Sequence, residues 1–162
     1  MGKKEEFRKR CKKIIEQLIK KSYPSLRNIK IHLNLWKQPR GSMMATKSIW
    51  GYYIFVDSKK YENAGDNILT GGLAHELAHL EHYKKISFLQ NFLETIKYIF
   101  SKQFRRDVEI KTDKKTIKKG YGKELLINTE FRIKTAHEKD IKYKRQFYMM
   151  PNEIKSLMKK KK

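Results

Sequence analysis

The chain has 162 residues, enough for one domain with a buried core. It carries 39 Lys and Arg residues against 17 Asp and Glu residues, so its formal net charge is +22. Its single cysteine, Cys11, excludes an intrachain disulfide. Since the N-terminus is charged and no run of about 18 apolar residues occurs, we expect a cytoplasmic protein without a membrane span.

The excess of basic residues has two interpretations. A strongly positive field attracts nucleic acid, anionic lipid or acidic proteins. The lysines, however, are spread from Lys3 to Lys162 instead of being gathered on one element, as in a chain with general lysine enrichment. We therefore expect no dedicated polyanion partner, although a nucleic-acid partner stays open as an alternative.

Two kinds of apolar periodicity divide the N-terminal half. Apolar side chains at helical spacing predict a helix over residues 4–21. Alternation of apolar and polar side chains within residues 28–57 predicts a small twisted sheet of about three strands, with Tyr52–Val56 the strongest of them. A second helix is predicted over residues 66–83. Together these elements favour an α+β fold.

Helices are predicted through most of the second half. Residues 87–104 have an amphipathic pattern that is more typical of a core helix than of a membrane-surface helix, so we expect this helix to pack into the core. The next helix covers residues 105–119 and ends at Gly120. Residues 127–162 are basic and predicted to be helical.

The segment His75-Glu76-Leu77-Ala78-His79 lies inside the predicted helix 66–83. Histidines four positions apart project from one helix face, so both rings can bind one Zn²⁺ while Glu76 reaches a water on that ion. The alternative is a chance pair of histidines on a core helix. Because the chain has only five histidines, we predict a zinc site with His75 and His79 as ligands and Glu76 as general base.

A catalytic zinc site usually takes three protein ligands, so a third is required. His82 lies on the same helix face but about 10 Å along the axis from His75, too far for one tetrahedral ion, so we expect it to support the site or cap the helix. Glu109 and Asp113 share one face of the helix 105–119. We predict Glu109 as the third ligand and Asp113 as the acceptor for a ligand imidazole, the alternative being a solvated acidic pair.

These motifs resemble those of the gluzincin metallopeptidases, in which a His-Glu-x-x-His helix is followed by a helix with Glu-x-x-x-Asp. The chain looks most like the minigluzincins, small soluble relatives of the membrane CAAX-prenyl-type and heat-shock-type proteases. The resemblance covers about residues 26–126. It implies a zincin-like fold and zinc-dependent hydrolysis of peptide bonds, with His75, His79 and Glu109 as ligands, Glu76 as base and Asp113 as their support.

The resemblance also implies a division of the chain. We place the peptidase domain at residues 1–126 and a helical basic segment at residues 127–162. Some minigluzincins are latent because a C-terminal segment obstructs the cleft. By this resemblance, residues 140–162 are expected to do so here, within one molecule or across a homodimer.

Several points stay open at this stage. Tyr121, Arg132 and His137 are unranked candidates for stabilising the oxyanion of a peptide substrate. The strand Tyr52–Val56 is either a cleft edge that pairs with an extended peptide or a core strand. The alternative function is a basic module that binds nucleic acid or an anionic surface, with a structural or degenerate zincin scaffold.

Overall fold

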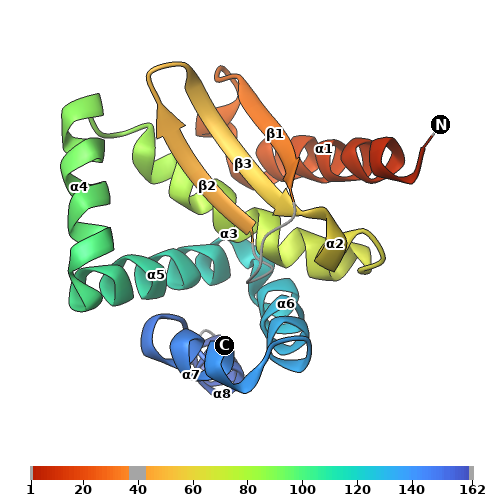
Figure 1. Cartoon of the computed structure of the whole chain (residues 1–162), viewed down its shortest axis with the longest axis vertical. Helices are drawn as coiled ribbons and strands as arrows, with labels where there is room; N and C mark the ends of the chain where they lie inside the picture. Colours follow the sequence, from red (N-terminus) through yellow and green to blue (C-terminus); the bar gives the residue numbers. More distant parts are fainter. Residues whose placement is uncertain (1, 37–42, 161–162) are drawn as a thin grey trace.

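The computed structural model describes residues 2–36 and 43–160, so the parts of the predicted sheet and tail at 37–42 and 161–162 lie outside the described residues. The protein is an α+β fold in which helices surround one small mixed sheet (Figure 1). In chain order the elements are α1 Lys3–Ser22, η1 Pro24–Leu26, β1 Ile31–Trp36, β2 Met43–Ser48, β3 Gly51–Asp57, α2 Ser58–Tyr61, α3 Asp66–Tyr83, α4 Phe88–Phe100, α5 Lys102–Thr116, η2 Ile117–Tyr121, α6 Gly122–Lys134, α7 Glu138–Phe147 and α8 Pro151–Lys159.

The sheet has the strand order β1-β3-β2, with β1 parallel and β2 antiparallel to β3. Its register pairs Leu33 with Ile54 and Ala45 with the same Ile54, so one buried row crosses all three strands. A tight turn joins β2 to β3, and Gly51 with φ of 133° provides the backbone conformation that β-carbon-bearing residues avoid. Since β3 is central, β2 is left as an edge strand.

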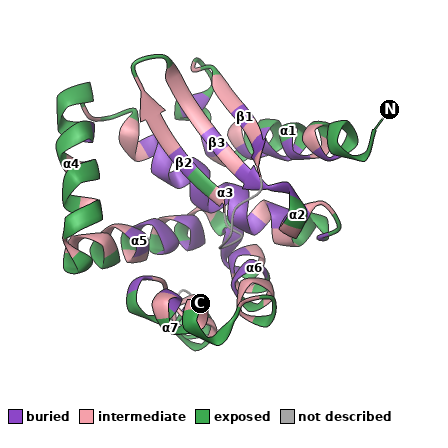
Figure 2. Ribbon diagram, viewed as in Figure 1, coloured by how far each residue is buried: buried purple, intermediate pink, exposed green. Residues whose placement is uncertain are grey.

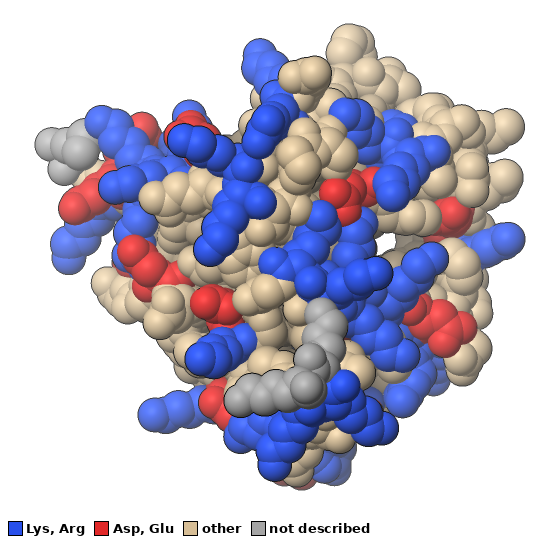
Figure 3. All heavy atoms as spheres, turned by 180° about the vertical axis from the view of Figure 1, so that it is seen from behind, with Lys and Arg blue, Asp and Glu red and all other residues tan. Residues whose placement is uncertain are grey.

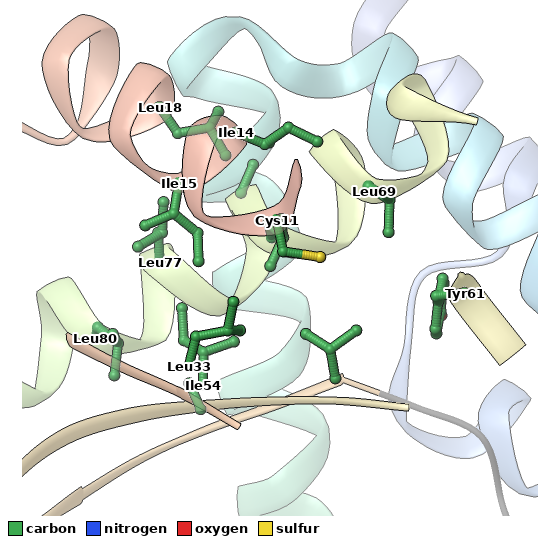
Figure 4. Packing of buried hydrophobic residues seen from close by; sticks show 14 of the residues in the cluster. Cys11, Ile14, Ile15, Leu18, Leu33, Ile54, Tyr61, Leu69, Leu77 and Leu80 are labelled. Atoms are coloured by element: carbon green, nitrogen blue, oxygen red, sulfur yellow. The ribbon is translucent and has the colours of Figure 1, made fainter. Parts of the chain in front are cut away.

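Helices α1 and α3 cover one face of the sheet (Figure 1). In Figure 4, side chains from α1 such as Ile15 and from α3 such as Leu77 point into one apolar layer above Leu33 and Ile54. Helix α3 is buried on nearly every side, as its purple colour in Figure 2 shows. Its buried residues include ionisable side chains, among them His75, Glu76 and His79, beside the apolar ones that face the sheet.

Helix α6 crosses α3 at very short range. A β-carbon placed on Gly71 of α3 would lie 2.1 Å from the carbonyl oxygen of Glu124 in α6. Only glycine allows this approach. Before α6, the chain turns through a π-helical segment at Gly120, whose φ of 96° ends the preceding helix as predicted. The result is that α6 lies directly against the helix that carries the two histidines.

The prediction that residues 87–104 form a core helix is wrong. The segment breaks at Ser101 into the end of α4 and the start of α5, and α4 stands at the edge of the molecule (Figure 1). Its large apolar side chains are all exposed, and Figure 2 shows the helix mostly green. We call this set the apolar face of α4; it comprises Phe88, Leu89, Phe92, Leu93, Ile96, Ile99 and Phe100.

The other predicted helices agree with the structure. The helix predicted over 4–21 is α1, the helix over 66–83 is α3, and the helix over 105–119 is α5 with its π-helical extension. The C-terminal segment is helical, as α6 to α8. The boundary drawn at residue 126 falls inside α6, whose first turn packs on α3.

Candidate metal centre

Helices α3 and α5 bring three candidate ligand atoms together. Nε2 of His75 lies 3.1 Å from Nε2 of His79 and 3.1 Å from Oε2 of Glu109. The distance from Nε2 of His79 to the same Glu109 oxygen is 3.4 Å. All three side chains are buried. The residues that the sequence predicts as ligands therefore form one tight group.

The spacing of this group suits a tetrahedral metal ion. Nitrogen and oxygen ligands about 2.0–2.1 Å from zinc stand roughly 3.3 Å apart in tetrahedral geometry. The three observed edges lie close to that value. Two imidazoles and one carboxylate also form a donor set that zinc accepts, with a fourth position left for a water molecule. The three residues could hold a metal ion, and their spacing and donor atoms fit zinc.

Neighbouring residues of α5 orient both imidazoles. Oδ1 of Asp113 lies 2.9 Å from Nδ1 of His75, so a protonated Nδ1 donates to the carboxylate. The hydroxyl of Thr112 lies 3.4 Å from Nδ1 of His79 and itself donates to a helix carbonyl, so its oxygen is free to accept. In both rings Nδ1 has an acceptor, which leaves each Nε2 available to bind a metal ion.

The third candidate ligand, Glu109, is contacted from a different helix. The hydroxyl of Tyr98 in α4 donates to Oε1 of Glu109, while Oε2 faces the two histidines. Burial disfavours ionisation of Glu109, but the adjacent His79 and His75 lower its pKa well below the ordinary value. Burial likewise opposes protonation of His75, yet Asp113 and Glu109 raise its pKa. The pocket therefore favours positive charge at the point where the three ligand atoms meet.

Glu76 occupies the position next to this group. Its side chain is buried, and burial raises the pKa of its carboxyl. It lines the same cleft as His75 and His79 but is not one of the three clustered ligands. A carboxyl group in this place can accept a proton from a molecule held at the metal position.

The group opens into a cleft of about 410 Å³. One wall is the edge strand β2, including Met43 and Thr46, and the opposite wall is formed by α4 and α5. Arg132 of α6 also lines the cleft, and its buried Nε has no hydrogen-bond partner among the described residues. The strand beside the cleft is therefore β2, and Tyr52–Val56 belongs to the central strand β3.

The positions of the remaining candidate residues show which of them lie at the cleft. Of the three oxyanion candidates, only Arg132 lines the cleft. Tyr121 instead hydrogen-bonds Ser22 at 3.0 Å, and His137 is the N-cap residue of α7. His82 lies outside the ligand group and pairs with Glu94 of α4 at 2.7 Å.

The link between α7 and α8, residues 148–150, lies beside His75 and Asp113. The ring of Tyr148 lies 6.2 Å from the ring of His75, and the guanidinium of Arg132 stacks 4.6 Å from the Tyr148 ring centre. The backbone N–H of Met149 donates to Oδ2 of Asp113 at 3.1 Å. Tyr148 also lines the cleft. The C-terminal segment thus contacts the residues that orient the ligands.

Sequence reasoning missed Tyr98, Thr112 and Tyr148. Thr112 follows from the pattern in principle, because it precedes Asp113 on the face of α5 that meets α3. Tyr98 gives a weaker signal, as one of several polar residues on the polar face of an amphipathic helix. Tyr148 gives none, since it reaches the site only through the folding of the last three helices.

Comparison with protein-family models, with curated proteins and with solved structures finds no match for this chain. The assignment of the site therefore depends on its own geometry. Among the described residues, no helix combines the length and apolar character needed to cross a bilayer.

Proposed function

We propose that the protein is a zinc-dependent metallopeptidase of the gluzincin type, most similar to the minigluzincins. The observation that carries the proposal is the buried triangle of His75, His79 and Glu109 with Glu76 beside it at the floor of a cleft. The motif order, His-Glu-x-x-His and then Glu-x-x-x-Asp, gives independent support from the sequence. Zinc would be held by the two Nε2 atoms and Oε2 of Glu109.

Each side chain has a distinct part in this chemistry. When bound, zinc supplies an acidified water and polarises the carbonyl of the scissile bond. Glu76 takes the proton from the attacking water and delivers it to the leaving amine. Arg132 is the candidate for stabilising the oxyanion, because its Nε has no other described partner and its side chain lines the cleft. Asp113 and Thr112 hold the two imidazoles in place.

The edge strand β2 provides a way to align the substrate. Its pairing with β3 uses one side, so the other side is available to an extended peptide along Met43–Thr46. Addition of a peptide strand to a sheet edge satisfies backbone hydrogen bonds without requiring a particular sequence. We assign this role to β2 instead of Tyr52–Val56.

The same proposal includes a latent state. Tyr148 lines the cleft beside the His75 ring, 6.2 Å away between ring centres, and its ring stacks on Arg132, the group assigned to the oxyanion. A substrate carbonyl at the metal position would compete with this side chain for the guanidinium. Residues 148–150 would therefore need to move before a peptide could bind productively.

The test of the peptidase is a Glu76→Gln variant of the full chain, assayed with fluorescein-labelled casein. We expect it to bind as much zinc as the wild type and to lose cleavage by about a hundredfold or more. A Glu94→Gln variant changes a cleft carboxylate outside the ligand group and serves as the control. Cleavage by Glu76→Gln at the wild-type rate would remove Glu76 as the base.

The test of latency is a Tyr148→Gly variant, also in the full chain. It removes the ring from the cleft and leaves the backbone contact of Met149 with Asp113 intact. We expect a rise in cleavage of at least about tenfold at unchanged zinc content, which corresponds to about 1.4 kcal/mol of occlusion. An active wild type that gains nothing from the substitution would contradict the latent state.

A further inference from the structure

Helix α4 presents its polar side to the protein and its apolar side to solvent. Every member of the apolar face is at least 39% exposed, and Phe100 is 83% exposed. At 100° per residue, these side chains form one continuous arc of roughly 140° around the helix. A core-forming amphipathic helix has the opposite orientation, so this arrangement needs its own explanation.

Polar contacts hold α4 in this orientation. The amide of Asn91 donates to the carbonyl of Lys47 in β2, Glu94 pairs with His82 of α3, and Tyr98 donates to Glu109 of α5. The three residues lie on the side of the helix opposite the apolar arc. Rolling the helix to bury its apolar face would break all three contacts, so exposure is the stable state of this fold.

Basic side chains accompany the exposed apolar face. Lys85 precedes α4, Lys97 lies at the border of the arc, and Lys102 follows the helix, and all three are exposed. Glu94 is the sole acidic residue between positions 84 and 102, and it is paired with His82. In Figure 3 the margin on the side of α4 is mostly tan, next to a back face on which blue basic side chains predominate.

A second apolar element lies near the start of α4. Ile49 and Trp50, in the turn between β2 and β3, are 68% and 79% exposed. Lys47 of β2 binds the carbonyl of Ile86 just before α4, which keeps this turn close to the helix. Tryptophan is favoured at the boundary between lipid headgroups and hydrocarbon.

We propose that the apolar face of α4 docks on an anionic lipid membrane. The helix has 13 residues, about 20 Å, which is too short to cross the hydrocarbon core but suits a helix lying in the interface. Apolar side chains enter the headgroup region while the flanking lysines meet anionic lipid. A second copy of the chain is a poorer occupant, because it carries the same +22 charge. This proposal does not depend on the peptidase activity.

The test is flotation of the full chain with lipid vesicles. One set contains phosphatidylcholine with about 30% phosphatidylserine, and the other contains phosphatidylcholine alone. We expect the wild type to float with the anionic vesicles and to bind the neutral ones at least about tenfold more weakly. Failure of the wild type to bind anionic vesicles would overturn the proposal.

Substitutions separate the apolar contribution from simple charge attraction. A double variant, Phe92→Gln with Leu93→Gln, is expected to weaken binding to anionic vesicles by at least about tenfold. Ile127→Gln changes a similarly apolar side chain on α6 that is 37% exposed and should bind as the wild type does. Binding of the double variant at wild-type strength would show that lysines act alone and would overturn the proposal.

Two further measurements complete the test. The flotation experiment is repeated with Phe100→Gln. Because Phe100 is the most exposed residue of the apolar face, this substitution should affect folding least. Sedimentation of the wild type without lipid measures self-association. A dimer that the Phe100→Gln variant abolishes, together with an absence of vesicle binding, would assign the face to a second copy instead of a membrane.

Discussion

Replacing Asp113 tests how the site is held together. Its two carboxylate oxygens have separate partners, Nδ1 of His75 at 2.9 Å and the backbone N–H of Met149 at 3.1 Å. Asp113→Ala removes both acceptors from a buried position. Loss of such an orienting carboxylate lowers metal affinity by about 10- to 100-fold, or about 1.4–2.8 kcal/mol.

The same substitution also affects stability, because the N–H of Met149 loses its acceptor. A buried donor left without a partner costs about 1–3 kcal/mol. For a chain of this size we expect the melting temperature of the metal-free protein to fall by about 2–12 °C. Asp113→Asn keeps one acceptor oxygen but turns an N–H₂ group toward the other donor, so its zinc affinity should fall less than that of Asp113→Ala.

Zinc affinity is measured by competition with a chromophoric chelator, and stability by thermal unfolding after metal removal. Asp107→Ala is the matched control, because that carboxylate lies on the same helix, is exposed and accepts a hydrogen bond from Gln103. It should leave zinc affinity unchanged. If Asp113→Ala bound zinc within about twofold of the wild type, the reasoning about imidazole orientation would be refuted.

Three further predictions concern packing and titration. Gly71→Ala places a β-carbon against backbone of α6 and should lower the melting temperature by about 6–12 °C, whereas Gly72→Ala meets the flexible side chain of Met43 and should cost less; equal melting temperatures would contradict this packing. Burial raises the pKa of Cys11 to about 12, so iodoacetamide at pH 8 should label it roughly a thousandfold faster in denaturant than in the folded protein, as mass spectrometry can measure. Burial lowers the pKa of Lys144 to about 8, so Lys144→Met should be more stable than the wild type at pH 7. This difference in stability should shrink as the pH rises above 8, because Lys144 then loses its charge in the folded protein before it does so in the unfolded chain. Denaturant titrations across this pH range would show a constant difference if the reasoning is wrong.

Local patterns were sufficient to predict the three candidate ligands that the structure brings together, but not the residues that contact them from α4 and the C-terminal segment. His75 and His79 share a helix face by spacing alone, and so do Glu109 and Asp113. Prediction of the two helices therefore already placed His75 beside His79 and Glu109 beside Asp113. The remaining step, contact between the helices, followed from chemistry, since a zinc site with two histidines requires a further ligand.

Tertiary packing decided what sequence periodicity could not. The pattern of residues 87–104 correctly predicts an amphipathic helix over Phe88–Phe100, but it misses the break at Ser101, and periodicity does not say which way the apolar face points. Polar contacts of Asn91, Glu94 and Tyr98 decide that direction, and each partner lies on another element: Lys47 on β2, His82 on α3 and Glu109 on α5. Tertiary packing also decides the position of Tyr148. It lines the cleft because the chain from α6 to α8 returns to His75 and Arg132.

The strand order could not be predicted either. Tyr52–Val56 has the strongest strand pattern because it is central and contacts strands on both sides. A strong strand signal therefore indicates burial, and the strand at the cleft edge is the weaker one, Met43–Ser48.

The central claim is that His75, His79 and Glu109 bind one zinc ion. The most direct measurement is the zinc content of the purified full chain after dialysis, by elemental analysis, for the wild type, Glu109→Ala and Glu94→Ala. We expect one equivalent in the wild type and in Glu94→Ala, and a loss of most of the metal in Glu109→Ala. Absence of zinc from a wild type refolded with the metal, or full retention by Glu109→Ala, would contradict the account.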